Sequence, residues 1–153
     1  DGRVVNAGIK IGLFDATHPD APALLHEEVI GKGGSVSPVS GNYHALSILK
    51  DPQNDRYKVV VPAQVHDGLL MFGDPDWGYY AWQSSRFRLF DIDANTNVIS
   101  SSGDLVVAAS TYDAGPESSF FRSVISGENV FAIYGNNVWS SLWSAPADAV
   151  GPQ

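Results

Sequence analysis

The sequence predicts an all-β fold built from antiparallel four-stranded sheets, and three observations support this prediction. Fifteen glycines and nine prolines are spread along the 153 residues, which favours many short strands and tight turns. Several runs alternate apolar and polar residues, as half-buried strands do. Helical periodicity is almost absent, and no stretch approaches the roughly 20 apolar residues of a membrane-spanning helix.

The first expected element is a pair of strands over residues 8–31. From Ile9 to Phe14 the side chains alternate between two faces, which is typical of a strand. Pro19 and Pro22 follow, and because proline has no backbone donor they end the strand at a corner. A second apolar run then carries the chain away from the corner.

Residues 32–109 are expected to form a complete four-stranded sheet. Its expected strands cover 43–49, 57–65, 86–91 and 98–109. The first two strands flank the turn cluster Asp-Pro-Gln-Asn-Asp and therefore form a hairpin. A long loop rich in aromatic residues is expected at 73–85, between the second and third strands.

The last part of the chain is expected to add most of one more sheet over residues 110–143. Apolar runs on both sides of the S-G-E-N sequence at 126–129 signal a hairpin. The final segment, 144–153, is small, polar and proline-bearing, so a frayed tail is expected there. The whole chain, 1–153, is expected to be a single segment of one fold.

The charge and the composition of the chain exclude several kinds of partner and chemistry. The formal net charge of −8 argues against nucleic acid as a partner. The chain has no cysteine, so it has no disulfide framework and no thiolate nucleophile or ligand. It begins without methionine and without the basic, then apolar start of a signal peptide. We therefore expect a processed piece of a longer protein.

A faint internal repeat links two strands. Leu13 begins a Leu-Phe-Asp sequence before a polar turn, and Leu89 begins the same sequence 76 residues later. This separation exceeds the roughly 40–50 residues of common repeats built from four-stranded sheets. The aromatic loop at 73–85 can hold the excess.

Three segments resemble one known family in their order and spacing. They are GIKIGLFDATHPDAP at 8–22, YHALSIL with YKVVVPAQV at 43–65, and FRSVISGENVFAIYGNNV at 121–138. The chain is similar to the C-terminal part of a secreted bacterial and archaeal β-propeller family distantly related to WD40 repeats. It departs from that family at the aromatic loop, 73–85, and over residues 140–153.

The resemblance implies a partial β-propeller with a little over two blades. Residues 8–31 would be the outer half of one blade, 32–109 a complete blade and 110–143 most of a last blade. It also implies a secreted, periplasmic or cell-surface location. Closure of a propeller takes about four blades or more, and unpaired strand edges promote aggregation. We therefore expect a protein partner, either missing N-terminal blades or another chain.

Four large aromatic residues in the loop are the candidate binding residues. Trp77, Tyr79, Tyr80 and Trp82 lie within the sequence D-P-D-W-G-Y-Y-A-W. Exposed aromatic rings stack on sugars or anchor protein partners, since they give a large contact area at low entropic cost. The alternative is that the rings pack the loop back onto the sheets.

A weak calcium candidate follows one of the strands. Asp91, Asp93 and Asn95 place oxygen atoms at alternate positions, as calcium loops do at their start. Thr96 stands where such loops carry glycine, and Ser102 stands where they carry glutamate. The alternative is an ordinary turn that closes a hairpin. No other cofactor is expected.

Three function classes remain open at this point. The first is an extracytoplasmic binding or scaffold module that presents loops to a protein or a glycan. The second is a propeller-type hydrolase, with carboxylates and histidines converging from several blades. The third is a structural assembly subunit. We assign no catalytic residue, because the four histidines and the serines lie in no recognised catalytic motif.

Overall fold

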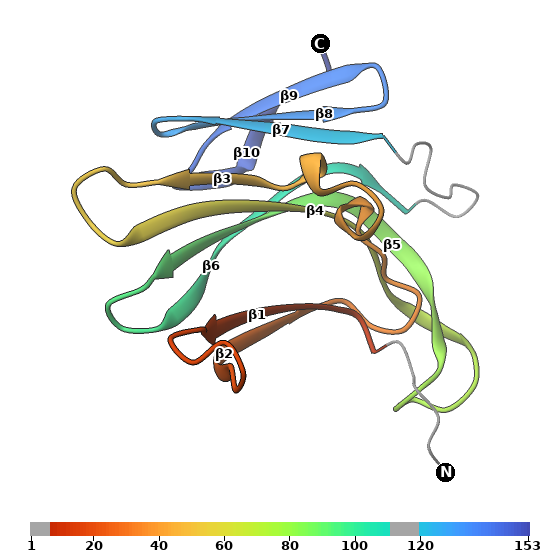
Figure 1. The fold of residues 1–153 in the computed structure, drawn as a ribbon. Helices are drawn as coiled ribbons and strands as arrows, with labels where there is room; N and C mark the ends of the chain where they lie inside the picture. The colour runs from red at the N-terminus through yellow and green to blue at the C-terminus, as the bar shows by residue number, and fades with distance from the viewer. Residues whose placement is uncertain (1–6, 111–119) are drawn as a thin grey trace.

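The computed structural model describes residues 7–110 and 120–153, and its strands form three antiparallel sheets (Figure 1). The first sheet is a hairpin of β1 (Ile9–Asp15) and β2 (Ala23–Ile30). The second has the order β3 (Ser47–Lys50), β4 (Arg56–Phe72), β5 (Tyr79–Asp93) and β6 (Val98–Ala109). The third has the order β10 (Ala145–Val150), β9 (Asn137–Leu142), β8 (Asn129–Tyr134) and β7 (Phe121–Ser126). Two short 3-10 helices, η1 (Pro38–Ser40) and η2 (Tyr43–Ala45), lie between β2 and β3.

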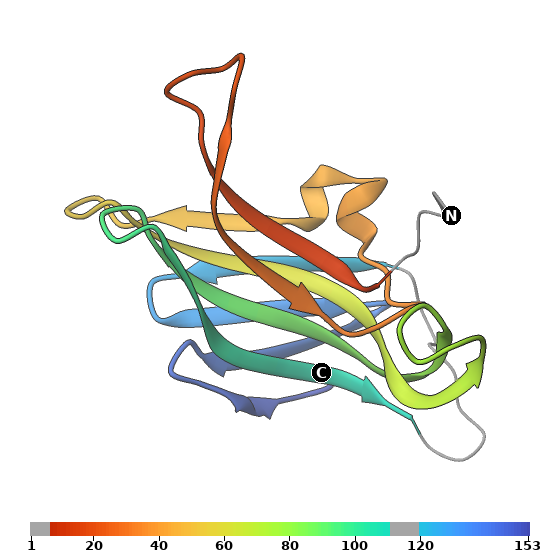
Figure 2. The same cartoon turned by 90° about the horizontal axis from the view of Figure 1, so that it is seen from below.

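The three sheets are stacked face to face, with sheet β3–β6 in the middle (Figures 1 and 2). The hairpin β1–β2 covers one face of this central sheet, and sheet β7–β10 covers the other. Stacked four-stranded antiparallel sheets are the blades of a β-propeller. The predicted fold class, a partial β-propeller with a little over two blades, is therefore confirmed.

Strand β4 is apolar on both of its faces because both faces are covered. Val59 and Val61 face the hairpin, in a buried cluster with Ile30. Val60 points the opposite way, as successive strand side chains do, and joins a second cluster with Phe121. A strand buried on both faces reads as a continuous apolar run rather than an alternating one. This explains the sequence V-V-V-P-A in the middle of the chain.

Pro62 lies inside β4 without interrupting a ladder of hydrogen bonds. On that edge, β3 pairs only with residues 57–60, and further along Val36 exchanges two backbone hydrogen bonds with Gln64, at 3.0 and 2.9 Å. The nitrogen of Pro62 lies between these two pairings, where no donor is needed. Its carbonyl accepts a hydrogen bond from Ser37 Oγ at 2.7 Å. The proline is therefore at a local edge, where prolines are tolerated.

The segment 43–49, expected to be one strand, begins as a 3-10 turn. The Asn42 side chain accepts a hydrogen bond from the backbone N–H of His44 at 3.1 Å, which caps η2 (Tyr43–Ala45). Asparagine stabilises such a turn because its side chain satisfies a donor that has no helical partner. The strand β3 starts only at Ser47.

The C-terminal segment forms a strand instead of the frayed tail expected over 144–153. Strand β10 pairs with β9, and beyond it Gln153 and Val138 exchange two backbone hydrogen bonds at 3.0 and 3.2 Å. Pro146 is buried against Gly103 of β6, and a Cβ on this glycine would lie 2.7 Å from the proline ring. Close packing against the central sheet therefore orders a segment whose composition alone is typical of a tail.

Candidate functional site

The hairpin of β4 and β5 extends beyond the sheet that contains it and forms an arm. Strand β3 ends its pairing at Val60, and β6 pairs with β5 only between Ser84 and Asp93. Residues 66–83, which we call the hairpin arm, therefore continue past both neighbours (Figures 1 and 2). The loop expected at 73–85 is much shorter, because β5 already begins at Tyr79.

A buried hydrogen-bond network holds the base of the arm. The backbone N–H of His66 donates to Ser35 Oγ at 2.9 Å, and Ser35 Oγ lies 3.3 Å from the carbonyl of His66. The ring Nδ1 of His66 lies 2.7 Å from the carbonyl of Tyr80, so Nδ1 carries the proton and donates. The backbone N–H of Tyr80 donates to Gly33 at 2.9 Å. The arm is thereby fixed to the segment between β2 and η1.

One glycine makes this close packing possible. Gly34 has a φ of +104°, in the region that side chains rarely adopt, and a Cβ there would lie 2.9 Å from His66 Nδ1. The imidazole therefore packs directly onto the backbone of Gly34. The base of the arm needs glycine at this position on both conformational and steric grounds.

The tip of the arm is also held in one conformation. Asp74 accepts from the backbone N–H of Asp76 at 3.2 Å through its side chain and from that of Trp77 at 3.1 Å through its carbonyl. The Tyr80 hydroxyl donates to the carbonyl of Pro75 at 2.8 Å. These contacts make a closed turn over residues 74–77.

The four aromatic candidates divide into two pairs. Tyr80 and Trp82 are buried, at 8% and 9% exposure, so they support the arm from within. Trp77 and Tyr79 are exposed, at 53% and 40%. The ring of Tyr79 stacks on that of Phe72, with centroids 5.1 Å apart and an interplanar angle of 1°. Only Trp77 and Tyr79 of the four therefore present their rings to an incoming partner.

Sequence reasoning missed the aliphatic part of this surface. Leu69, Met71 and Phe72 are exposed at 81%, 62% and 67%, and Leu70 is also exposed. The signal was four consecutive apolar residues directly before the turn, which a buried strand also explains. We call the exposed set the arm tip: Leu69, Leu70, Met71, Phe72, Trp77 and Tyr79.

The calcium candidates use their carboxylates for protein contacts. Asp93 accepts from the backbone N–H of Asn95 at 2.9 Å and pairs with Arg56 Nε at 3.1 Å. The hydrogen bond from Asn95, more than the charge of Arg56, holds the pKa of Asp93 below its usual value. Asp91 accepts from Trp143 Nε1 at 3.1 Å and also from Ser102 Oγ.

A calcium site also needs several oxygen ligands that converge on one point. Over residues 7–110 and 120–153, the structure brings no three histidine or acidic side chains together in a way that could hold a metal ion. The contacts of Asp93 and Asn95 are those of the turn between β5 and β6, whereas Asp91 links β5 to Ser102 of β6 and to Trp143. Calcium binding there stays a prediction.

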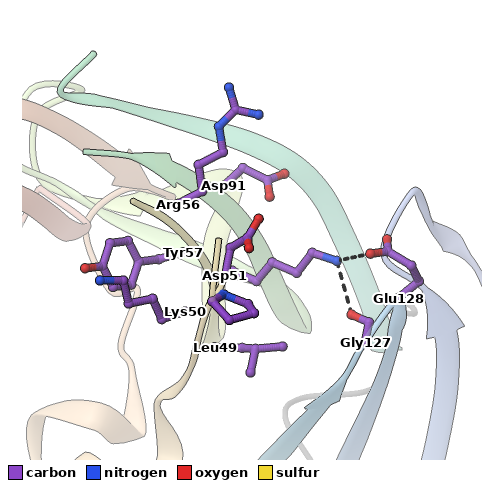
Figure 3. Close-up of a pocket in the computed structure, with 10 residues that line it drawn as sticks. Leu49, Lys50, Asp51, Arg56, Tyr57, Asp91, Gly127 and Glu128 are labelled. Atoms are coloured by element: carbon purple, nitrogen blue, oxygen red, sulfur yellow. Dashed lines mark hydrogen bonds and ion pairs between the residues drawn. The ribbon is translucent and has the colours of Figure 1, made fainter. Parts of the chain in front are cut away.

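A pocket of about 460 Å³ lies at the other end of β4 from the arm (Figure 3). Its walls come from the turn between β3 and β4 and from the turn between β7 and β8, and include Tyr57, Asp91 and Glu128. Lys58 is one of the lining residues and donates to Glu128 at 2.7 Å and to the carbonyl of Gly127 at 3.1 Å, the two bonds dashed in Figure 3. The Lys58 ammonium also lies 5.1 Å from the ring centre of Trp143. The pocket is therefore a charged junction between two sheets, and its lining includes a lysine that bridges them.

Two of the histidines make structural contacts rather than a catalytic pair. His26 Nδ1 accepts from the backbone N–H of Ile99 at 3.1 Å, which ties β2 to β6, and its Nε2 lies 3.7 Å from Glu28, beyond a hydrogen bond. His66 serves the base of the arm. Among the described helices, none combines the length and the hydropathy needed to cross a bilayer.

The comparison with family models agrees with this architecture. The family model described as Beta propeller domain matches residues 1–145. Searches of curated proteins and of solved structures gave no match.

Proposed function

Because the chain belongs to the β-propeller domain family, we propose that it is a binding and scaffold module of an extracytoplasmic β-propeller. In this proposal further blades cover its two end faces, and its projecting loops present a surface to a protein partner. The hairpin 8–31 is the outer half of one blade, and the two four-stranded sheets are the next two.

The observation that carries the proposal is the apolar outer face of the last sheet. Each of its four strands contributes at least one exposed apolar side chain to the face that points away from the central sheet. They are Val124 of β7, Phe131 of β8, Val138 and Leu142 of β9, and Val150 of β10. The residues between them, such as Val130 and Trp139, fill the buried cluster on the other face. A sheet that is apolar on both faces is built to be covered on both.

The hairpin β1–β2, at the opposite end of the stack, also exposes apolar side chains. On the hairpin β1–β2, Ile9, Ile11 and Leu13 pack onto the central sheet. Phe14 and Val29 are 55% and 51% exposed on the hairpin. Strand β1 also has β2 as its one partner in the described sheet, which leaves its other edge open for a further strand.

Covering these faces would stabilise the molecule appreciably. Full burial of one Val, Leu or Phe side chain contributes about 1.5–3 kcal/mol. The five side chains on the last sheet are between 37% and 62% exposed. Their burial therefore contributes on the order of 5 kcal/mol, comparable with the stability of a whole domain.

The test is the mass of the particle in solution, measured by light scattering on a sizing column over a range of chain concentrations. We expect assembly with other blades or copies, weakened by Phe131→Lys, which places a charge on the end face. Ser144→Lys, on an exposed residue in the turn between β9 and β10, is the control because it leaves the apolar face unchanged. A stable monomer at every concentration, with no affinity for further blades, would contradict the proposal.

A glycan is the second candidate partner, favoured by one observation. The stacked rings of Phe72 and Tyr79 and the indole of Trp77 present flat aromatic surfaces of the kind that sugars contact. A glycan array decides between the two: binding that is lost in Trp77→Ala supports a glycan, and no bound glycan leaves the protein partner.

A further inference from the structure

The arm tip exposes an unusual number of large apolar side chains. Its six side chains are between 37% and 81% exposed. They come from the turn at 74–77 and from the two paired strand ends on either side of it. Large clusters of exposed apolar side chains mark interaction sites, whereas single exposed ones are ordinary.

The arm is prepared for binding because both of its ends are held in place. The base is fixed through Ser35 and His66, and the turn at the tip is closed by the hydroxyl of Tyr80. A surface that is already ordered loses little conformational entropy when a partner binds.

The composition of the tip favours a protein over a sugar. Trp, Tyr, Phe and Met are the residues enriched in the centres of protein interfaces. Leu69 and Met71, two of the most exposed residues of the tip, are aliphatic and offer no ring for a sugar to stack on. A partner that covers the whole tip must itself present apolar side chains.

The charge of the arm selects among apolar partners. Residues 66–83 contain three aspartates and no lysine or arginine. Asp67 is paired with Lys32 at 2.8 Å, but Asp74 and Asp76 are exposed beside Trp77. A second copy would bring these carboxylates together and would carry the same net charge of −8. An anionic lipid surface is repelled for the same reason.

We infer that the arm tip docks a basic amphipathic protein segment, one that presents apolar side chains flanked by lysine or arginine. This inference rests on the proposed binding function and names its partner. Apolar side chains of the segment cover Met71, Phe72 and Trp77, and its cations face Asp74 and Asp76. Complementary charge speeds and orients the encounter, and apolar contact holds the complex.

The experiment titrates the full chain into two labelled synthetic amphipathic peptides with the same apolar residues, one flanked by lysines and the other by glutamates. Fluorescence anisotropy should show binding of the lysine peptide, weaker at high salt, and little binding of the glutamate peptide. Met71→Ser and Trp77→Ala should each weaken binding by about tenfold or more, the effect of an interface anchor. Ile48→Ser, on an apolar residue of β3 that is 59% exposed, is the matched control and should bind as the parent chain does.

Four results would overturn the inference. The first two are equal binding of both peptides and unchanged binding by the two arm variants. The third is a lower particle mass of the arm variants, which would assign the tip to self-association. The fourth is binding to phosphatidylcholine vesicles as tight as to the lysine peptide, which would assign the tip to a membrane. Loss of assembly in Phe131→Lys with retained peptide binding separates a failure of the scaffold from a failure of the arm.

Discussion

Replacing Ser35 by alanine removes the hydroxyl that links the arm to the segment between β2 and η1. The side chain is 2% exposed, and its oxygen accepts from the His66 N–H at 2.9 Å. Alanine fills almost the same volume, so the change leaves no large cavity. The carbonyl of His66 keeps a partner, because it also accepts from the backbone N–H of Lys32 at 2.9 Å. The effect of the substitution therefore comes from one group, the N–H of His66.

A buried backbone donor without an acceptor costs about 1–3 kcal/mol. We expect Ser35→Ala to lower the free energy of unfolding in urea by this amount. Hydrogen exchange should become faster in the arm, residues 66–83, while Val59–Val61 keep their protection.

Ser40→Ala is the matched control. Its hydroxyl donates to the carbonyl of Ser37 at 2.8 Å on the exposed side of η1, where water can replace the bond. The control should change stability by no more than about 0.5 kcal/mol. Equal effects of the two substitutions, or unchanged exchange in the arm, would refute the view that this network holds the arm.

Two further predictions concern junctions between sheets, and a third concerns the turn between β5 and β6. Phe121→Ala should lower the free energy of unfolding in urea by about 3–5 kcal/mol. The reason is that this ring is 1% exposed and packs on Phe87 and Tyr134, with ring centroids 5.5 and 5.0 Å away. The control, Phe120→Ala, changes an exposed neighbour and should have little effect. Gly103→Val should release β10, because Gly103 has a φ of +119° and a Cβ there would meet the ring of Pro146. The release should appear as faster hydrogen exchange in Ala145–Val150. Unchanged exchange there would show that the contact is dispensable. The lowered pKa of Asp93 means that its stabilising effect is complete above the unfolded pKa of about 4 and is lost as the pH falls through the folded value. Asp93→Asn should therefore flatten the loss of stability between neutral and acidic pH, and an unaltered pH profile would remove Asp93 from the explanation.

Much of the fold could be predicted because strand patterns are local. The run at 59–65 and the hairpin around 126–129 carry their structure in a few neighbouring residues. The Leu-Phe-Asp sequences at Leu13 and Leu89 lie in β1 and β5, each of which pairs with the strand that follows it. That shared position fits the proposal that β1 and β2 are the outer half of a blade.

The arm and the C-terminal strand could not be predicted in the same way. The arm depends on Ser35 meeting His66 across 31 residues, and β10 depends on Pro146 meeting Gly103. Such contacts leave no periodic signal in the sequence. The aromatic residues of the loop were recognised, but their separation into supporting and exposed rings depends on the register of Tyr79 with Phe72, which only the structure gives.

The position of the arm has a consequence for how the sequence of this protein can diverge during evolution. The arm begins where the pairing with β3 and β6 has ended, so its length can vary without moving any residue of the blade core. Inserting one residue in each strand lengthens a hairpin and keeps its strands paired. Each such insertion also turns the side chains beyond it to the other face of the hairpin. The surface that selects the partner is thus free to diverge while the blades that carry it stay constant.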